Sequence, residues 1–229
     1  MQLLEKEVDV LEKTKNQLTS ESYFPAETIL KSKGKTNTYN KDELIFNIGQ
    51  SSEDIFVIEK GRVKIGRAIE DGKDILIAIL EENDIFGEMI IAGELLRKDY
   101  AVAMDDHTVV KSVTFSEMKE IIHLSPEINH TIFQLLGRRI RRTESRLSAL
   151  ILKDARTRIV DFLKELAEEK GRKVGFETMI KNHFTHKDIA NLTGTSRQTV
   201  TTTLNALRGQ NIINFDRRRI LIRDLALLV

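Results

Sequence analysis

Hydrophobic positions along the chain follow three successive periodicities. Residues 1 to 20 predict an amphipathic N-terminal arm that ends before Pro25, because apolar side chains recur there at helical spacing. From about residue 33 to residue 115 the pattern changes to short β-type runs, separated by turns that contain Gly, Asn or Asp. Many short strands at this spacing are typical of a small antiparallel barrel or a jelly-roll-type β-roll.

The third periodicity predicts one long helix from about Pro126 to Leu152. Its stripe has steps of 3 and 4 residues and is formed by Phe133, Leu136, Ile140, Thr143, Leu147 and Leu150. At 1.5 Å per residue such a helix is about 40 Å long, which is more than the roll alone can cover. We therefore expect a parallel homodimer with these six residues at its interface; packing within one chain is the alternative. Thr143, the one polar member, would set the register or meet a ligand bound between the subunits.

A helix-turn-helix motif is predicted between residues 184 and 211. Thr185 and Asp188 have the spacing of a capping box that opens a short helix, and Gly194 is placed to end it with a positive φ. Ser196 then caps a second helix, in which an apolar stripe that includes Val200 is buried. A small residue, a turn glycine and an apolar anchor at this spacing are typical of the motif.

The outer face of the second helix carries side chains suited to DNA bases, namely Arg197, Gln198, Thr201, Thr202 and Asn205. Arginine can donate two hydrogen bonds to guanine, glutamine and asparagine can pair with adenine, and threonine offers a hydroxyl and a methyl group to thymine. A solvated polar face is the alternative. The set predicted to bind DNA also includes the cap residues Thr185 and Ser196.

The segment NIINFDRRRILIRD, which follows the second helix, predicts a β-hairpin or wing. Its turn carries Arg217, Arg218 and Arg219, which can contact phosphates and so position the protein without selecting a sequence.

Charge is distributed unevenly between the two parts of the chain. From Lys153 to the end there are 15 Lys and Arg against 9 Asp and Glu, whereas residues 1 to 152 carry 21 against 26. A basic C-terminal third is the electrostatic pattern expected of a nucleic-acid-binding module.

The chain contains no cysteine, which excludes disulfides, a thiolate-held iron–sulfur cluster, a cysteine zinc site and a cysteine nucleophile. No apolar run approaches the roughly 18 residues needed to cross a bilayer. The first residues mix acidic and basic side chains, unlike a secretory signal. We therefore expect a cytoplasmic protein without a membrane partner.

The order of β-roll, long helix and winged helix-turn-helix resembles the bacterial CRP/FNR family of transcription regulators. The residues that carry the resemblance are IEKGRVKI at 58 to 65, DIFGE at 84 to 88, QLLGRRIRRTESRLSAL, and TSRQTV at 195 to 200 followed by LNALRGQNII. The resemblance covers nearly all of the chain after about Phe24.

The resemblance implies an α+β fold in three parts. Residues 1–125 would form the arm and an effector-binding roll, 126–152 the dimerisation helix, and 153–229 the DNA-binding domain. It also implies a homodimer that binds a palindromic operator in double-stranded DNA, with RNA polymerase as a further partner and a signal received in the roll.

The effector site departs from the cyclic-AMP-binding members of the family. Gly87 and Glu88 match the family's glycine and ribose-binding glutamate, and Thr143 matches a residue that meets adenine. The Arg-Ser pair that holds the cyclic phosphate is replaced by Lys98 and Asp99, with Arg97 one residue earlier. We therefore predict a small anionic effector bound by Gly87, Glu88, Arg97, Lys98 and Thr143, with cyclic AMP as one candidate.

Three alternatives remain open. A heme-based gas sensor of the same family would use His107, His123 or His130 as a ligand; His183 and His186 precede and open the first helix of the motif, where a surface role is expected. A cyclic-nucleotide-binding module could act on a protein partner without DNA. A cupin-like enzyme would need an inward cluster of histidines and carboxylates, and the sequence offers no metal site and no catalytic residue of this kind.

Overall fold

The computed structural model describes residue 31 and residues 34–69, 73–124, 126–181, 184–216 and 218–228. These residues divide into two compact units, one up to Arg139 and the other from Ile140 on. The arm predicted for residues 1 to 20 lies outside the described residues. The three-part division predicted from the sequence stays a prediction, because the two units meet within the long helix.

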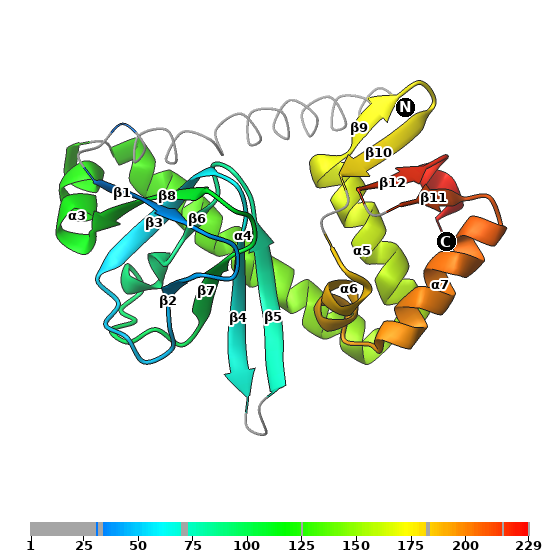
Figure 1. Ribbon diagram of the computed structural model, residues 1–229, viewed down its shortest axis with the longest axis horizontal. Helices are drawn as coiled ribbons and strands as arrows, with labels where there is room; N and C mark the ends of the chain where they lie inside the picture. Colours follow the sequence, from blue (N-terminus) through cyan, green and yellow to red (C-terminus); the bar gives the residue numbers. More distant parts are fainter. Residues whose placement is uncertain are drawn as a thin grey trace, which may run out of the picture. The chain divides into compact units, whose positions relative to one another are not determined.

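Two four-stranded antiparallel sheets form the first unit (Figure 1). One sheet has the order β1 (Lys35–Tyr39), β8 (Thr108–Thr114), β3 (Asp54–Lys60) and β6 (Ile85–Phe86). The other has the order β2 (Leu44–Phe46), β7 (Tyr100–Ala103), β4 (Val63–Ile69) and β5 (Lys73–Leu80). The predicted antiparallel β-roll is therefore confirmed.

Strand β3 is buried on both faces, which explains why its sequence is a continuous apolar run instead of an alternating one. Phe56 and Ile58 face a cluster between the sheets that includes the stacked rings of Phe56 and Phe86, with centroids 5.0 Å apart. Ile55 and Val57 face a second cluster. This cluster is completed by α3 (Phe115–Leu124) and by the first turns of α4 (Pro126–Leu152).

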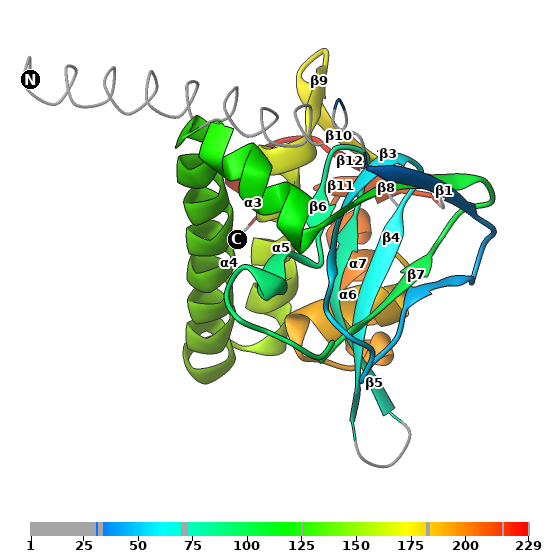
Figure 2. The same ribbon diagram turned by 90° about the vertical axis from the view of Figure 1, so that its left-hand side faces the viewer.

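Helix α4 is one continuous helix of 27 residues, as predicted (Figure 1 and Figure 2). Its first turns bury Ile128 and Ile132 in the second cluster of the roll, and Leu136 is partly buried against the same cluster. Most of the predicted seam is exposed to solvent: Phe133 at 67%, Ile140 and Leu147 at 59% each, and Leu150 at 51%. Among the described residues no helix combines the length and apolar character that a membrane crossing requires.

The second unit contains three further helices and a four-stranded sheet. The helices are α5 (Ala155–Lys170), α6 (His186–Thr193) and α7 (Arg197–Gly209). The sheet has the order β11 (Ile213–Phe215), β12 (Arg219–Ile222), β10 (Glu177–Lys181) and β9 (Arg172–Val174). The winged helix-turn-helix is confirmed. Strands β9 and β10 extend the expected hairpin into a sheet.

One hydrophobic core unites this unit. Ile159 and Leu163 of α5, Ile189 of α6 and Leu204 and Leu207 of α7 are almost fully buried in it. Local sequence sets both ends of α6. A complete capping box at Thr185 opens the helix, and Gly194 ends it with φ 61°.

Candidate DNA interface and effector site

Helix α7 separates its side chains into a buried stripe and an outer face. Val200, Leu204 and Leu207 are at most 1% exposed, and Thr203 is also buried. The side chains predicted to read bases lie on the other side of the helix: Arg197, Gln198, Thr202 and Asn205 are exposed and Thr201 is half-buried. The structure thus brings the five predicted residues together on one face.

Two hydrogen bonds from Arg158 on α5 fix the turn between α6 and α7. Its guanidinium donates to the backbone oxygens of Thr193 at 2.8 Å and Gly194 at 3.0 Å, and to that of Lys153 at 2.7 Å. Arginine bonds of this kind are charge-assisted and therefore comparatively strong. Sequence reasoning missed Arg158, because its acceptors are backbone atoms up to 36 residues away.

The hydroxyl groups of Thr185 and Ser196 are engaged as helix caps. Ser196 Oγ accepts from the backbone N–H of Thr199 at 3.0 Å. Thr185 Oγ1 accepts from the backbone N–H of Asp188 and donates to the Asp188 carboxylate at 2.7 Å. Their direct role is thus to place the starts of α6 and α7.

The wing turn is ordered by Asp216. Its carboxylate accepts from the backbone N–H groups of Arg218 at 2.7 Å and Arg219 at 3.0 Å, and from Nε of Arg219 at 3.1 Å. Backbone donation by Arg218 lowers the pKa of Asp216 below its ordinary value, with a further contribution from the Arg219 side chain. The side chain of Arg218 is exposed, and Arg217 lies outside the described residues.

Arg208 and His186 contact the reading face, which is the outer face of α7 formed by Arg197, Gln198, Thr201, Thr202 and Asn205. Neither residue was predicted to take part in DNA binding. Arg208 donates to Asn205 Oδ1 at 3.0 Å and lies over the Phe215 ring, 4.9 Å from its centroid. His186 Nδ1 is 2.8 Å from Thr201 Oγ1. No periodicity signals these pairs, since they depend on how α6, α7 and β11 pack.

Glu88 is the centre of the predicted effector region in the roll. It follows Gly87, whose φ of 75° favours glycine, and its side chain is only 2% exposed. One carboxylate oxygen forms an ion pair with Arg139 of α4, and Arg139 also donates to the backbone oxygen of Ile85 at 3.1 Å. The other oxygen, Oε2, is buried without a hydrogen-bond partner. Arg139 was not among the predicted effector residues.

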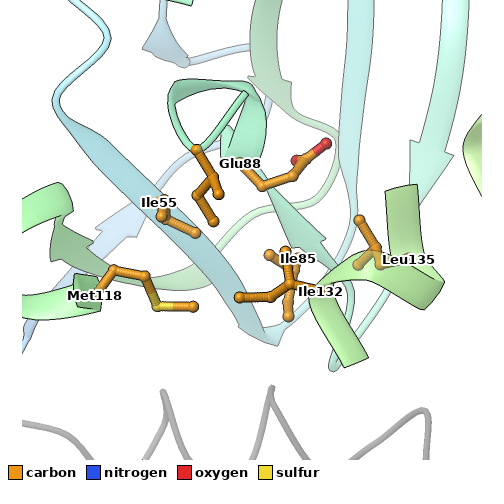
Figure 3. Close-up of a pocket in the computed structure, with 7 residues that line it drawn as sticks. Ile55, Ile85, Glu88, Met118, Ile132 and Leu135 are labelled. Atoms are coloured by element: carbon orange, nitrogen blue, oxygen red, sulfur yellow. The ribbon is translucent and has the colours of Figure 1, made fainter. Parts of the chain in front are cut away.

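A small apolar cavity lies beside Glu88 (Figure 3). Its other lining residues are Ile55, Ile85, Ile91, Met118, Ile132 and Leu135. The cavity volume is about 10 Å³, enough for roughly one water molecule. An organic effector would therefore need the surrounding side chains to move.

Arg97 and Lys98 do not form a pair of cations directed at one pocket. Arg97 is 4% exposed, donates to the backbone oxygens of Gly87 and Asp54, and lies 4.4 Å from the centroid of the Phe46 ring. Burial lowers its pKa from the ordinary arginine value. Lys98, in contrast, is exposed. The predicted clamp assumed that both side chains face a ligand, whereas Arg97 is oriented by backbone carbonyls inside the roll.

Asp99, which replaces the family serine, is paired with Arg67 at 2.7 Å. Its charge is therefore partly compensated within the protein. Thr143 is exposed on α4, four residues after Arg139.

The three histidines considered as heme ligands lie in different elements of the first unit. His107 is in a turn with φ 57°, His123 is in the last turn of α3, and His130 contacts Gln134 at 2.9 Å. Within the described ranges, no three or more His, Cys, Asp or Glu side chains are grouped in a way that could hold a metal ion. His183 is not among the described residues.

Comparison with known proteins places this arrangement in a family. Residues 36–123 match the cyclic nucleotide-binding domain, and residues 157–229 match the Crp-like helix-turn-helix domain. A CRP-like cAMP-activated global transcriptional regulator of Mycobacterium tuberculosis is 30% identical over 186 residues, which span 81% of this chain and 83% of that protein. The chain belongs to the CRP/FNR family of transcriptional regulators.

Other members of the CRP/FNR family are similar over a comparable length. A global nitrogen regulator of Synechocystis is 28% identical over 188 residues, covering 82% of this chain and 84% of its own. The solved structure of a CooA mutant from Carboxydothermus hydrogenoformans has 27% sequence identity and a TM-score of 0.74, covering 85% of this chain and 86% of that one. This CRP/FNR protein is thus a CRP-like transcriptional regulator with a cyclic nucleotide-binding domain and a helix-turn-helix.

Replacing Arg97 with methionine should destabilise the roll, whereas replacing Lys98 with methionine should not. Arg97→Met leaves two carbonyl oxygens without their donor, at a cost of about 1–3 kcal/mol in the free energy of unfolding. Lys98 is exposed, so Lys98→Met should change this free energy by less than about 0.5 kcal/mol. Urea denaturation of both variants measures the difference. Equal stability of the two variants would contradict the structural role given to Arg97.

Proposed function

We propose that this chain is a sequence-specific DNA-binding regulator that acts as a homodimer and whose DNA affinity is set by a small effector bound in the roll. The observation that carries the proposal is the outer face of α7, where Arg197, Gln198, Thr202 and Asn205 are all exposed while the opposite stripe is buried. A helix in this position of a winged helix-turn-helix enters the major groove with its N-terminal residues against base edges.

Arg197 is the strongest candidate for direct base recognition. It is the first residue of α7 and is exposed, and a bidentate contact to guanine O6 and N7 is the commonest specific contact that arginine makes. Gln198 beside it can pair with adenine N6 and N7. The exposed Arg218 of the wing turn, with Arg217 and Arg219, would contact phosphates and fix the register.

Dimer formation is supported by the exposed apolar face of α4. Ile140, Leu147 and Leu150 are each more than half exposed, which is unusual for large aliphatic side chains in a row along one helix. A second copy of α4 would cover them through a symmetric seam, so that each contact counts twice. A dimer of this kind reads two half-sites, which is why we propose a palindromic operator.

The effector proposal is supported by the ion pair between Glu88 and Arg139. Glu88 Oε2 is buried without a partner, so a ligand that donates a hydrogen bond to Glu88 and brings an anion to Arg139 would compete with the existing pair. Exposed Lys98 would add a second cation. Cyclic AMP, with a hydroxyl donor and an anionic phosphate, is one candidate among small anionic effectors.

Such an effector would act by binding one conformation of the dimer more tightly than another. A tenfold preference corresponds to about 1.4 kcal/mol of coupling. Family membership also supports RNA polymerase as a partner and the cytoplasm as the location.

Arg197→Ala should reduce affinity for the specific site by about 1–3 kcal/mol while leaving binding to unrelated DNA nearly unchanged. Genomic fragments bound by the purified protein supply the specific site, and mobility shifts at one fixed salt concentration measure both affinities. Lys153→Ala, which removes a cation outside the reading face, serves as the control. Equal losses on specific and unrelated DNA would contradict base recognition by Arg197, and no selected fragment at all would contradict the proposed function.

Ile140→Glu combined with Leu147→Glu should raise the dimer dissociation constant by more than about 100-fold, because four buried aliphatic side chains are lost across a symmetric interface. Ser145→Glu, a matched charge on the opposite side of α4, should leave it unchanged. Sedimentation velocity measures the association state. A double variant that remains dimeric would show that this face of α4 is not the interface.

Glu88→Gln and Lys98→Ala should each weaken effector binding at least about tenfold, because each removes a charged group of the proposed site. The measurement is calorimetric titration with cyclic AMP, cyclic GMP and simple anionic metabolites, with Lys41→Ala as the exposed-lysine control. Tight binding that neither substitution affects would contradict the proposed site. A visible absorption band in the purified protein would favour the heme-based alternative.

A further inference from the structure

Thr201 lies on the reading face of α7, but its hydroxyl group is already engaged within the protein. Thr201 Oγ1 donates to the backbone oxygen of Arg197, one turn earlier, at 2.9 Å. A threonine hydroxyl has one proton and two lone pairs. Its only proton is therefore used along the helix, and none remains for an acceptor such as thymine O4 or guanine O6.

His186, the first residue of α6, contacts the same oxygen. His186 Nδ1 lies 2.8 Å from Thr201 Oγ1. When Nδ1 carries a proton, the imidazole donates to Thr201 Oγ1 and the hydroxyl proton goes to the Arg197 oxygen. When Nδ1 is unprotonated, the hydroxyl can donate to the ring instead. In both tautomers the hydroxyl proton is used within the protein.

The imidazole of His186 also contacts the wing. The rings of His186 and Phe215 on β11 meet edge to face, with centroids 6.2 Å apart, and Arg208 of α7 covers the Phe215 ring at 4.9 Å. The elements α6, α7 and β11 thus converge on the orientation of one threonine side chain. Both contacts engage the hydroxyl group of Thr201, and its γ-methyl group is left available for an apolar contact.

We propose that His186 is a positioning residue that makes Thr201 present its methyl group, and not its hydroxyl, to DNA, so that one position of each half-site is selected for the thymine 5-methyl group. The inference rests on the proposed function. It differs from the expectation that a threonine offers both groups to a base, because the bonds to Arg197 and His186 remove the hydroxyl as a donor. Apolar contact with the 5-methyl group is one of the interactions by which thymine is recognised in the major groove.

The test replaces the thymines of the selected half-site, one at a time, by deoxyuridine, which lacks only the methyl group. Wild-type protein should lose about fourfold in affinity per half-site at one of these positions, the effect of one buried methyl-sized group. Thr201→Val, which keeps the methyl group, should retain this loss. Thr201→Ser, which keeps only the hydroxyl, should abolish it. Thr202→Ser is the matched control on the next residue and should leave the loss at that position unchanged.

His186→Ala should reduce the discrimination between thymine and deoxyuridine at the same position and broaden the base preference there. His186→Gln, whose side-chain amide can donate, should restore part of it. Thermal denaturation establishes that each variant is folded, and a merely structural role for His186 would lower affinity for every sequence without changing this ratio.

The outcomes separate the inference from the function on which it rests. If a random duplex pool yields no enriched half-site with wild-type protein, the proposed function fails. If a half-site is enriched but deoxyuridine is tolerated at every thymine, or Thr201→Ser discriminates as wild type does, the function stands and the inference is overturned.

Discussion

Burial of one stripe of α7 is the constraint on which DNA recognition depends. Val200, Leu204 and Leu207 are at most 1% exposed because they fill the core that α7 shares with α5 and α6. Burying three such side chains contributes roughly 5–9 kcal/mol, far more than any single polar contact on the other side of the helix. The rotation of α7 about its axis is thereby fixed, and with it the identity of the residues that face solvent. The caps at Thr185 and Ser196 and the hydrogen bonds of Arg158 then fix where α7 begins.

A different constraint acts in the roll: two charged side chains are buried there, and each needs a partner that compensates its charge. Arg97 and Glu88 are each less than 5% exposed. Arg97 is compensated by two backbone carbonyls and the Phe46 ring, so it is a fixed part of the roll. Glu88 is compensated by a side chain of α4, Arg139, which is 42% exposed and therefore within reach of a ligand from solvent. We infer that this buried charge, paired with a partly exposed side chain of α4, is the feature by which a ligand in the roll could be coupled to α4.

The local features of the fold could be predicted from sequence because their signals lie within a few residues. The capping box, the turn at Gly194, the buried stripe of α7 and the length of α4 are all set by spacing along one segment. The reading face followed from the same spacing, since the residues opposite a buried stripe must face outward.

Features that depend on distant partners could not be predicted in this way. Arg97 and Lys98 are adjacent cations in the sequence, yet one is buried and the other exposed, because only the packing around Phe46 and Phe56 distinguishes them. The pair of Glu88 and Arg139 joins residues 51 positions apart. Likewise, the pairing of His186 with Thr201 depends on the angle between two short helices.

Recognition of DNA in the major groove by the outer face of α7 is tested most directly by dimethyl sulfate footprinting of the protein on its selected site. The reagent methylates guanine N7, the major-groove atom that Arg197 would contact. We predict two protected clusters of guanines about one helical turn apart, one for each half-site of a dimer. Full binding with every guanine N7 still reactive would contradict it.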